Sequence, residues 1–127
     1  MDRTSFDDWV RRYLVAWDTD DESDIAALFT EDATYQTGPF DEPWIGRDEI
    51  VAQWRARGDS GTEWSFEWEV AAVDGDLGVI VGETDYPASG HHYKNVWFVR
   101  LAQDGRATSF QEWWVARPKP KEDQTGG

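Results

Sequence analysis

The spacing of apolar residues changes once along this chain of 127 residues, from a helical period to strict alternation. In the first half, apolar side chains recur every three or four residues, beginning with Phe6, Trp9 and Tyr13, as on the buried face of a helix. From Trp64 onward they recur at every second residue, as on one face of a strand. Helices followed by strands predict a single α+β domain in which helices cover one face of a sheet.

The helical half divides into three predicted helices. A capping-box pattern at Ser5 opens the first helix, and Ser23 can cap a short second helix. The third begins near Arg47, and Gly58 stands where a helix stop is expected. Between the second and third helices, residues 33–37 are typical of a short strand that leads into an irregular loop.

The second half contains four strand-like runs joined by short turns. The turns, at 74–76, 87–90 and 104–105, are rich in glycine, proline and aspartate, so the strands are predicted to form an antiparallel meander. The end of the chain is rich in proline, lysine and polar residues and cannot bury much apolar area. We therefore expect one domain over 1–117 and a disordered tail over 118–127.

Alternation also assigns side chains to the two faces of the predicted sheet. In the last strand, Phe110, Glu112 and Trp114 share the face that meets the helices. The opposite face is apolar as well, and helices on one side leave it uncovered. We therefore expect a homodimer packed through the outer sheet face, with contacts from Val96, Phe98, Trp113 and Val115.

Five short motifs, each weak alone, are specific in their combined order and spacing. They are Leu28-Phe29-Thr30-Glu31-Asp32-Ala33-Thr34-Tyr35, Pro39-Phe40, Gly46-Arg47-Asp48-Glu49-Ile50, Asp104-Gly105-Arg106 and Glu112-Trp113-Trp114. With these motifs, most of the chain resembles the SnoaL-like branch of the nuclear transport factor 2-like superfamily. The resemblance implies three N-terminal helices packed on one strongly curved mixed or antiparallel sheet. Helices and sheet would form a cone with an internal pocket, and dimers would be common.

The same resemblance brings several possible functions. Such cones serve as steroid isomerases, polyketide cyclases, dehydratases and epoxide hydrolases, and also as proteins with no known reaction, so the fold does not decide the function. In a gapless comparison with ketosteroid isomerases, Tyr13 aligns with the oxyanion-hole tyrosine. Thr37 and Trp97 stand where those enzymes keep an aspartate base and a protonated aspartate. Two of three key positions differ, which argues against steroid isomerase chemistry of that type.

Three residues are candidates for acid–base catalysis. Glu112 lies among aromatic residues, where burial is expected to raise its pKa and prepare it as a general base or acid. A register error of one residue, or an ion pair with an arginine, would remove that role. Tyr13 can donate to a developing oxyanion or can be a core tyrosine bonded to a backbone carbonyl. His92 follows a hairpin turn and could reach the pocket mouth, although loop histidines are mostly solvated.

Aromatic side chains are the expected wall of the pocket. Nine tryptophans, four tyrosines and six phenylalanines in so short a chain suit a flat, apolar or ring-shaped ligand. Asn95 could orient a substrate carbonyl or hydroxyl, or hydrogen-bond a buried loop. The ligand-binding residues predicted from the helical and alternating patterns are Trp17, Tyr35, Trp54, Asn95, Trp97 and Trp114.

Charge and missing motifs exclude several function classes. A net charge of -14 repels phosphate backbones and anionic lipid, so nucleic acid and membrane are poor partners. There is no cysteine for thiolate chemistry, no run of 18 apolar residues, no phosphate-binding glycine loop, no zinc helix and no serine-hydrolase elbow. We expect no metal and no cofactor, and a cytoplasmic location.

Three functions remain open from the sequence. The first is a cofactor-independent isomerase, cyclase or dehydratase that acts by general acid–base catalysis on a hydrophobic carbonyl compound. The second is a binding or carrier protein for a small aromatic or isoprenoid-like molecule. The third is a dimerisation module whose cone is filled by tryptophans. Pocket volume separates the last from the other two.

Overall fold

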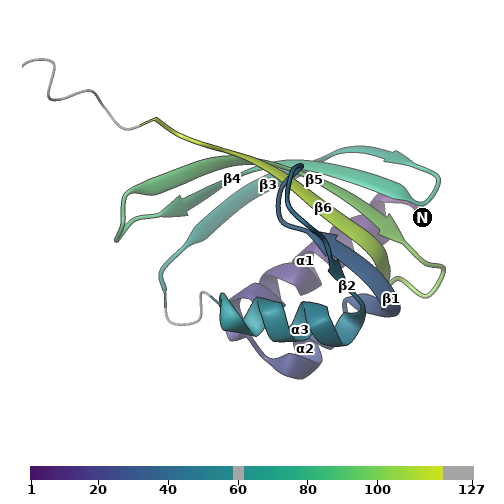
Figure 1. The fold of residues 1–127 in the computed structure, drawn as a ribbon. Helices are drawn as coiled ribbons and strands as arrows, with labels where there is room; N and C mark the ends of the chain where they lie inside the picture. Colours follow the sequence, from purple (N-terminus) through teal and green to yellow (C-terminus); the bar gives the residue numbers. More distant parts are fainter. Residues whose placement is uncertain (59–61, 119–127) are drawn as a thin grey trace, which may run out of the picture.

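Helices come first and long strands afterwards, as the change of period predicted (Figure 1). The computed structural model describes residues 1–58 and 62–118, so most of the tail predicted over 118–127 lies outside the described residues. The described elements are α1 (Arg3–Thr19), α2 (Glu22–Ala26), β1 (Phe29–Gln36), β2 (Trp44–Ile45), α3 (Arg47–Ala56), β3 (Ser65–Asp74), β4 (Leu77–Tyr86), β5 (His91–Leu101) and β6 (Ala107–Ala116). None of the described helices is both long and apolar enough to cross a membrane.

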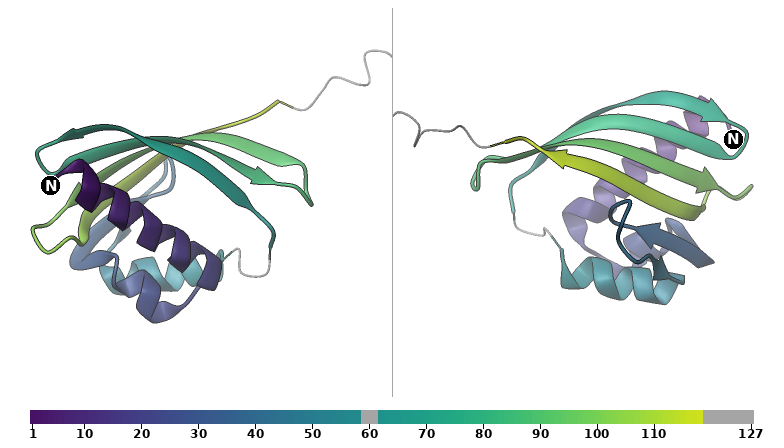
Figure 2. Two further views of the ribbon diagram at one scale, coloured as in Figure 1. Left: turned by 180° about the vertical axis from the view of Figure 1, so that it is seen from behind. Right: turned by 45° about the horizontal axis from the view of Figure 1, so that its top comes forward.

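The strands form one mixed sheet in the order β2-β1-β6-β5-β4-β3. The four long strands pair antiparallel in sequence order, whereas β1 and β6 run parallel. The sheet is curved, and all three helices lie on one side of it (Figures 1 and 2). We call this the helix-facing side and the opposite one the outer side. The α+β class, the three helices and the mixed, curved sheet are thus as predicted.

Two helix starts differ from the sequence prediction. The N-cap of α1 is Asp2: its carboxylate accepts from the amide of Ser5 at 2.7 Å, and its own amide donates to the Ser5 hydroxyl at 3.1 Å. The N-cap of α2 is Asp21, which accepts from the amide of Asp24 at 3.1 Å. In both cases a carboxylate that precedes the serine takes the capping position, because it accepts from the free amides of the first turn equally well.

The strand predicted at 33–37 is longer, since β1 begins at Phe29. Phe29 pairs with Ala107 of β6, and the register shifts between Phe29 and Thr34. The polar residues within this irregular stretch resemble a turn in sequence, which hid the first half of the strand. Pairing with β6 supplies backbone hydrogen bonds that the local sequence does not predict.

Large apolar side chains fill the space between α1 and the sheet. Phe6, Trp9 and Val10 of α1 are fully buried, as are Ile80 of β4 and Val99 of β5. Trp9 also donates its indole N–H to the carbonyl of Leu28 at 3.0 Å, which ties α1 to the start of β1. Each such side chain contributes roughly 1.5–3 kcal/mol on burial. This core fixes the helices against the strands and so positions the site.

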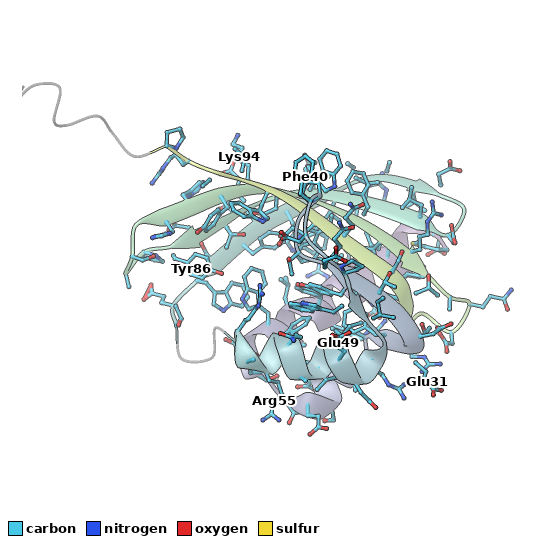
Figure 3. All side chains as sticks on the ribbon, viewed as in Figure 1. Glu31, Phe40, Glu49, Arg55, Tyr86 and Lys94 are labelled. Carbon is cyan, nitrogen blue, oxygen red and sulfur yellow. The ribbon has the colours of Figure 1, made fainter. Side chains whose placement is uncertain are left out.

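The outer side of the sheet carries exposed apolar side chains. Trp113 and Val115 are 48% and 71% exposed, and Trp113 meets the ring of Phe98 edge-on at 5.8 Å. Lys94 points to this outer side, whereas Tyr86 points to the helix-facing side (Figure 3). Alternation therefore assigned the two faces correctly, and the homodimer through the outer face stays a prediction.

Candidate functional site

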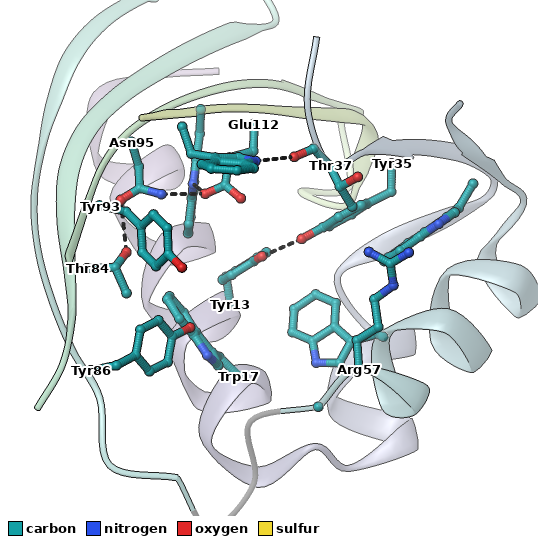
Figure 4. A pocket seen from close by; sticks show the side chains of 15 residues that line it. Tyr13, Trp17, Tyr35, Thr37, Arg57, Thr84, Tyr86, Tyr93, Asn95 and Glu112 are labelled. Carbon is teal, nitrogen blue, oxygen red and sulfur yellow. Dashed lines mark hydrogen bonds between the residues drawn. The ribbon is translucent and has the colours of Figure 1, made fainter. Parts of the chain in front are cut away.

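A pocket of about 460 Å³ opens on the helix-facing side of the sheet. Figure 4 shows the 15 side chains that line it. Its volume lies within the range of roughly 300–1,000 Å³ found for small-molecule sites. Eight of the nine site residues predicted from the sequence line it, namely Tyr13, Trp17, Tyr35, Trp54, Asn95, Trp97, Glu112 and Trp114.

Glu112 is held at one carboxylate oxygen by two N–H donors. Its Oε2 accepts from the side-chain amide of Asn95 and from the indole N–H of Trp97, each at 2.8 Å. Trp97 is its direct cross-strand partner on β5, and Asn95 lies two residues earlier on the same face. Oε1 has no hydrogen bond to any described residue and faces the pocket (Figure 4).

Thr84 of β4 fixes the orientation of Asn95. The threonine hydroxyl donates to Oδ1 of Asn95 at 2.8 Å, and both side chains are buried. With its oxygen occupied in this way, the amide presents its NH₂ group to Glu112. The three strands β4, β5 and β6 thus supply one hydrogen-bonded chain from Thr84 through Asn95 to Glu112.

Burial raises the pKa of Glu112, and its hydrogen bonds to Trp97 and Asn95 oppose that rise without cancelling it. The direction agrees with the sequence expectation. Glu112 makes no ion pair with a described arginine, and the register places it inward, so neither of the two alternatives applies. Because both groups at Oε2 are donors, the proton of the neutral acid has to reside on Oε1, where a ligand can exchange it.

Tyr13 of α1 and Tyr35 of β1 form a second polar pair in the pocket wall. Their hydroxyl oxygens lie 2.6 Å apart, and either can be the donor. Tyr13 thus bonds a side-chain hydroxyl, so the alternative of a core tyrosine bonded to a backbone carbonyl does not apply. Burial raises the pKa of both tyrosines, so both stay neutral. When one hydroxyl donates to the other, the second keeps its proton for a ligand.

Stacked rings hold this tyrosine pair in place. Trp44 stacks on Tyr35 with ring centroids 4.8 Å apart, and Tyr35 stacks on Phe110 at 4.4 Å. Tyr13 lies against the same Phe110 at 5.3 Å, so the four rings form a nearly parallel column. Rigid, apolar walls of this kind suit a flat ligand and restrict the hydroxyl positions.

His92 does not reach the pocket, so its proposed place at the pocket mouth is wrong. Its Nε2 lies 2.9 Å from Glu83 and its Nδ1 3.3 Å from Asp85. The neighbouring Tyr93 lines the pocket instead. Alternation along β5 therefore turns His92 to the outer side. The sequence prediction treated this residue as part of a turn, whereas β5 already begins at His91.

Sequence reasoning missed several lining residues. Thr84 and Tyr86 line the pocket from β4, where they share a face with the buried Ile80. Alternation along β4 could have found both. Arg57 lines the pocket from just beyond the end of α3, where no periodicity applies. Among the residues that the structure describes, no group of three or more histidine, aspartate or glutamate side chains could hold a metal ion.

Comparison with known proteins gives one matching family model, described as a SnoaL-like domain, over residues 10–110. No protein with a curated description matches. One similar solved structure is that of SalBIII, an epoxide hydrolase/cyclase-like enzyme with a role in pyran ring formation in the polyether salinomycin. Its TM-score is 0.72 at 18% identity, and the match covers 90% of this chain and 93% of SalBIII.

Two further solved structures share the fold. A ketosteroid isomerase-like protein from Erwinia carotovora atroseptica has a TM-score of 0.65 at 18% identity, covering 91% of this chain and 97% of its own. An NTF-2 like protein of unknown function from Burkholderia xenovorans has a TM-score of 0.71 at 14% identity, covering 97% and 92%. At such identities these structures establish the fold of this chain and leave its chemistry to its own residues.

Proposed function

Since the chain belongs to the SnoaL-like family of the nuclear transport factor 2-like superfamily, we propose that it is a cofactor-independent isomerase, cyclase or dehydratase. Its substrate would be a small hydrophobic carbonyl compound, bound in the pocket between the helices and the curved sheet, which together would form a cone. The observation that supports this most is Glu112, which has one oxygen fixed by two donors and the other facing the pocket.

The proposed reaction is a proton transfer next to a carbonyl group. Ionised Glu112 removes a proton from the carbon beside the carbonyl through Oε1, and the electron pair of the broken C–H bond forms the enolate. The O–H of the Tyr13–Tyr35 pair that remains available donates to the enolate oxygen. Glu112 then returns its proton, either to another carbon or to a leaving hydroxyl, which gives isomerisation or dehydration.

The environment of both groups supports these roles. The raised pKa of Glu112 makes it a stronger base than an exposed carboxylate and lets it exchange protons closer to neutral pH. The raised pKa values of Tyr13 and Tyr35 keep their hydroxyls protonated, as an oxyanion donor has to be. Because Tyr13 and Tyr35 are buried, a hydrogen bond from their hydroxyls to the developing charge is stronger there than in solvent.

A binding or carrier protein is the second candidate. Thr37 and Trp97 favour this function, since they stand where the isomerases keep their two aspartates. Glu112 is then the single acidic side chain among the described lining residues of the pocket. Its ligand would be a small aromatic or isoprenoid-like molecule. A pocket of about 460 Å³ argues against the third possibility, an interior filled by tryptophans.

Hydrogen exchange tests the catalytic proposal without knowledge of the natural substrate. A panel of cyclic and aryl ketones is incubated with the protein in D₂O, and loss of the α-proton signals is followed by NMR. We expect faster exchange than in buffer for at least one ketone, and a loss of about 100-fold to 10,000-fold in Glu112→Gln. Glu67→Gln, which removes an exposed carboxylate of β3, is the matched control and should exchange at the wild-type rate.

Two results would contradict the catalytic proposal. If Glu112→Gln exchanged every accepted ketone at the wild-type rate, the carboxyl would not be the base. If ketones bound saturably but exchanged no faster than in buffer, the carrier function would be the better description.

A further inference from the structure

Arg57 brings a positive charge to the pocket of a strongly acidic protein. Among the described lining residues it is the one cation, and Glu112 is the one acidic side chain. Arg57 follows the last turn of α3, where its amide donates to the carbonyl of Gln53 at 3.2 Å, so its backbone is fixed. The side chain reaches the pocket on the side of Tyr35, opposite Thr84 and Tyr86 (Figure 4).

Arg57 has no carboxylate partner among the described residues, although the chain has 26 acidic residues. Five other arginines pair with described carboxylates, as Arg11 does with Asp7 at 2.7 Å, but none of these five lines the pocket. Where anions are so abundant, a guanidinium in a pocket wall that pairs with no described carboxylate is placed to bind an anionic group of a ligand.

The contact that Arg57 does make leaves its hydrogen-bond donors available. Its guanidinium carbon lies 5.3 Å from the ring centroid of Trp44, within the range of a cation–π interaction. A guanidinium over an aromatic ring keeps its N–H groups directed sideways. Trp44 stacks in turn on Tyr35, so the charge stands at the end of the ring column.

The charge of Arg57 also acts on the polar centre of the pocket. It lowers the pKa of Tyr35, against the larger effect of burial, which raises it. An anion placed beside Arg57 would therefore lie close to the tyrosine pair while remaining on the opposite side of the pocket from Asn95. A flat ligand could then have its ring against the column and its anionic group on the guanidinium.

We infer that Arg57 makes the pocket selective for ligands that carry a carboxylate. This inference deepens the proposed function, since it rests on the pocket being a small-molecule site. A carboxylate matches the planar fork of a guanidinium and can accept two N–H bonds. Because a net charge of -14 repels anions from the molecule as a whole, a local cation is needed to favour an acidic ligand over its neutral analogue.

A matched pair of probes tests this selectivity. Binding of 2-naphthoate and 2-naphthamide is measured by tryptophan fluorescence at pH 7.5 on wild type, Arg57→Gln and Arg55→Gln. We expect wild type to favour naphthoate by about 10-fold or more, and Arg57→Gln to lose that preference. Arg55→Gln removes the same charge from α3, but Arg55 does not line the pocket, so the preference should remain.

Arg57→Lys and salt refine the expected result. A lysine keeps the charge without the planar fork, so it should keep only part of the preference. Raising the ionic strength should reduce the preference for naphthoate, since Arg57 is exposed to solvent.

The outcomes separate this inference from the proposed function. Three results would overturn the inference about Arg57. The first is an unchanged ratio of naphthoate to naphthamide affinity in Arg57→Gln, and the second is an equal loss of that ratio in Arg55→Gln. The third is no binding of either probe to wild type. Glu112→Gln is measured in the same binding assay and should keep the naphthoate preference even though it loses hydrogen exchange. A lack of ketone hydrogen exchange would therefore contradict the catalytic proposal. A lack of preference for naphthoate over naphthamide would contradict the role of Arg57.

Discussion

The helix-facing side of the sheet has a closed end and an open end, built from the same strands and the same helix. At the closed end, Phe6 of α1, Ile80 of β4 and Val99 of β5 have no exposed surface. At the open end, Trp17 of α1 is partly exposed and Trp114 of β6 is 49% exposed. One element thus contributes to the sealed core along one part of its length and to the pocket along another.

This difference assigns stability and chemistry to separate parts of the same elements. The hydrogen-bonded chain from Thr84 to Glu112 lies at the open end, where a ligand can reach it. The buried polar side chains, Thr84 and Asn95, both line the pocket, so the described residues of the closed end contribute mainly through apolar burial. Substitutions at the closed end should therefore change stability, and those at the open end should change binding and rate.

The largest expected effect is a loss of stability at the closed end. Ile80→Ala removes three buried carbon atoms beneath α1 and should lower the free energy of unfolding by about 2–5 kcal/mol. Urea unfolding followed by tryptophan fluorescence measures the loss. Naphthamide affinity of the folded protein should not change, because Ile80 does not line the pocket. A loss below about 1 kcal/mol would show that the closed end is not the stabilising core.

The next effect concerns rate at the open end. Thr84→Val keeps the shape of the side chain but removes the hydroxyl that orients Asn95. We expect hydrogen exchange to slow by about 10-fold, since a lost hydrogen bond costs roughly 1–1.5 kcal/mol. The pH profile should also move to higher pH, because an Asn95 amide that Thr84 no longer orients donates less well to Glu112, which raises the pKa of Glu112 further. A slower rate with an unmoved profile would mean that Thr84 only supports the fold.

A smaller effect is the pH dependence that Glu112 imposes on stability. Burial raises its folded-state pKa above the ordinary value of 4.5, so the folded protein binds this proton more tightly than the unfolded chain. The stability contribution is therefore full below pH 4.5 and is lost as pH rises through the folded-state pKa. Each unit of that rise corresponds to about 1.36 kcal/mol.

Glu112→Gln isolates this contribution from the other titrating groups. Asp2, Asp21, Glu83 and Asp104 have lowered pKa values and give the opposite pH trend, but they are present in both proteins. Unfolding is compared from pH 5 to pH 8, above the isoelectric point near 4.3. The variant should gain stability relative to wild type as pH rises. A constant difference would mean that the carboxyl is solvated.

The sequence predicts which face of the sheet a side chain is on, but it does not predict whether the side chain lies at the closed end or the open end. Alternation identified the face of each strand, so Asn95, Trp97 and Glu112 were correctly placed together. Alternation carries no information about position along the strand, which separates pocket from core. The position along the strand depends on how α1 crosses the sheet. At Gly78, for example, the ring of Phe6 from α1 occupies the space that a Cβ would need.

The missed and misplaced residues have related causes. Arg57 lies beyond the last turn of a helix, where side-chain direction is set by the chain's exit and not by a period. The pairing of Tyr13 with Tyr35 joins residues 22 positions apart on different elements, so no local pattern predicts it. His92 was misplaced because the strand extends further into the turn than the glycine and proline signals indicated.

The smallest expected effect on the pocket comes from the outer side of β6. Trp113 and Val115 are largely exposed, so replacing both by serine should change the stability of a single chain by less than about 1 kcal/mol. Hydrogen exchange and naphthoate preference should not change, because neither side chain lines the pocket. The predicted change is in assembly: sedimentation should find a dimer for wild type and a monomer for the double variant.

The outer face carries one carboxylate that is balanced within its chain, Glu83, and two on β3, Glu67 and Glu69, that have no ion pair with a described residue. A two-fold axis brings each patch against its own copy, so unpaired carboxylates there would repel. Glu83 is already paired within its chain, 3.4 Å from Lys94 and 2.9 Å from His92. The exposed indole and valine therefore adjoin a carboxylate whose charge is largely balanced. A monomeric wild type at high protein concentration would contradict this assembly and would leave the catalytic and Arg57 proposals unaffected, because every residue they use lies on the helix-facing side.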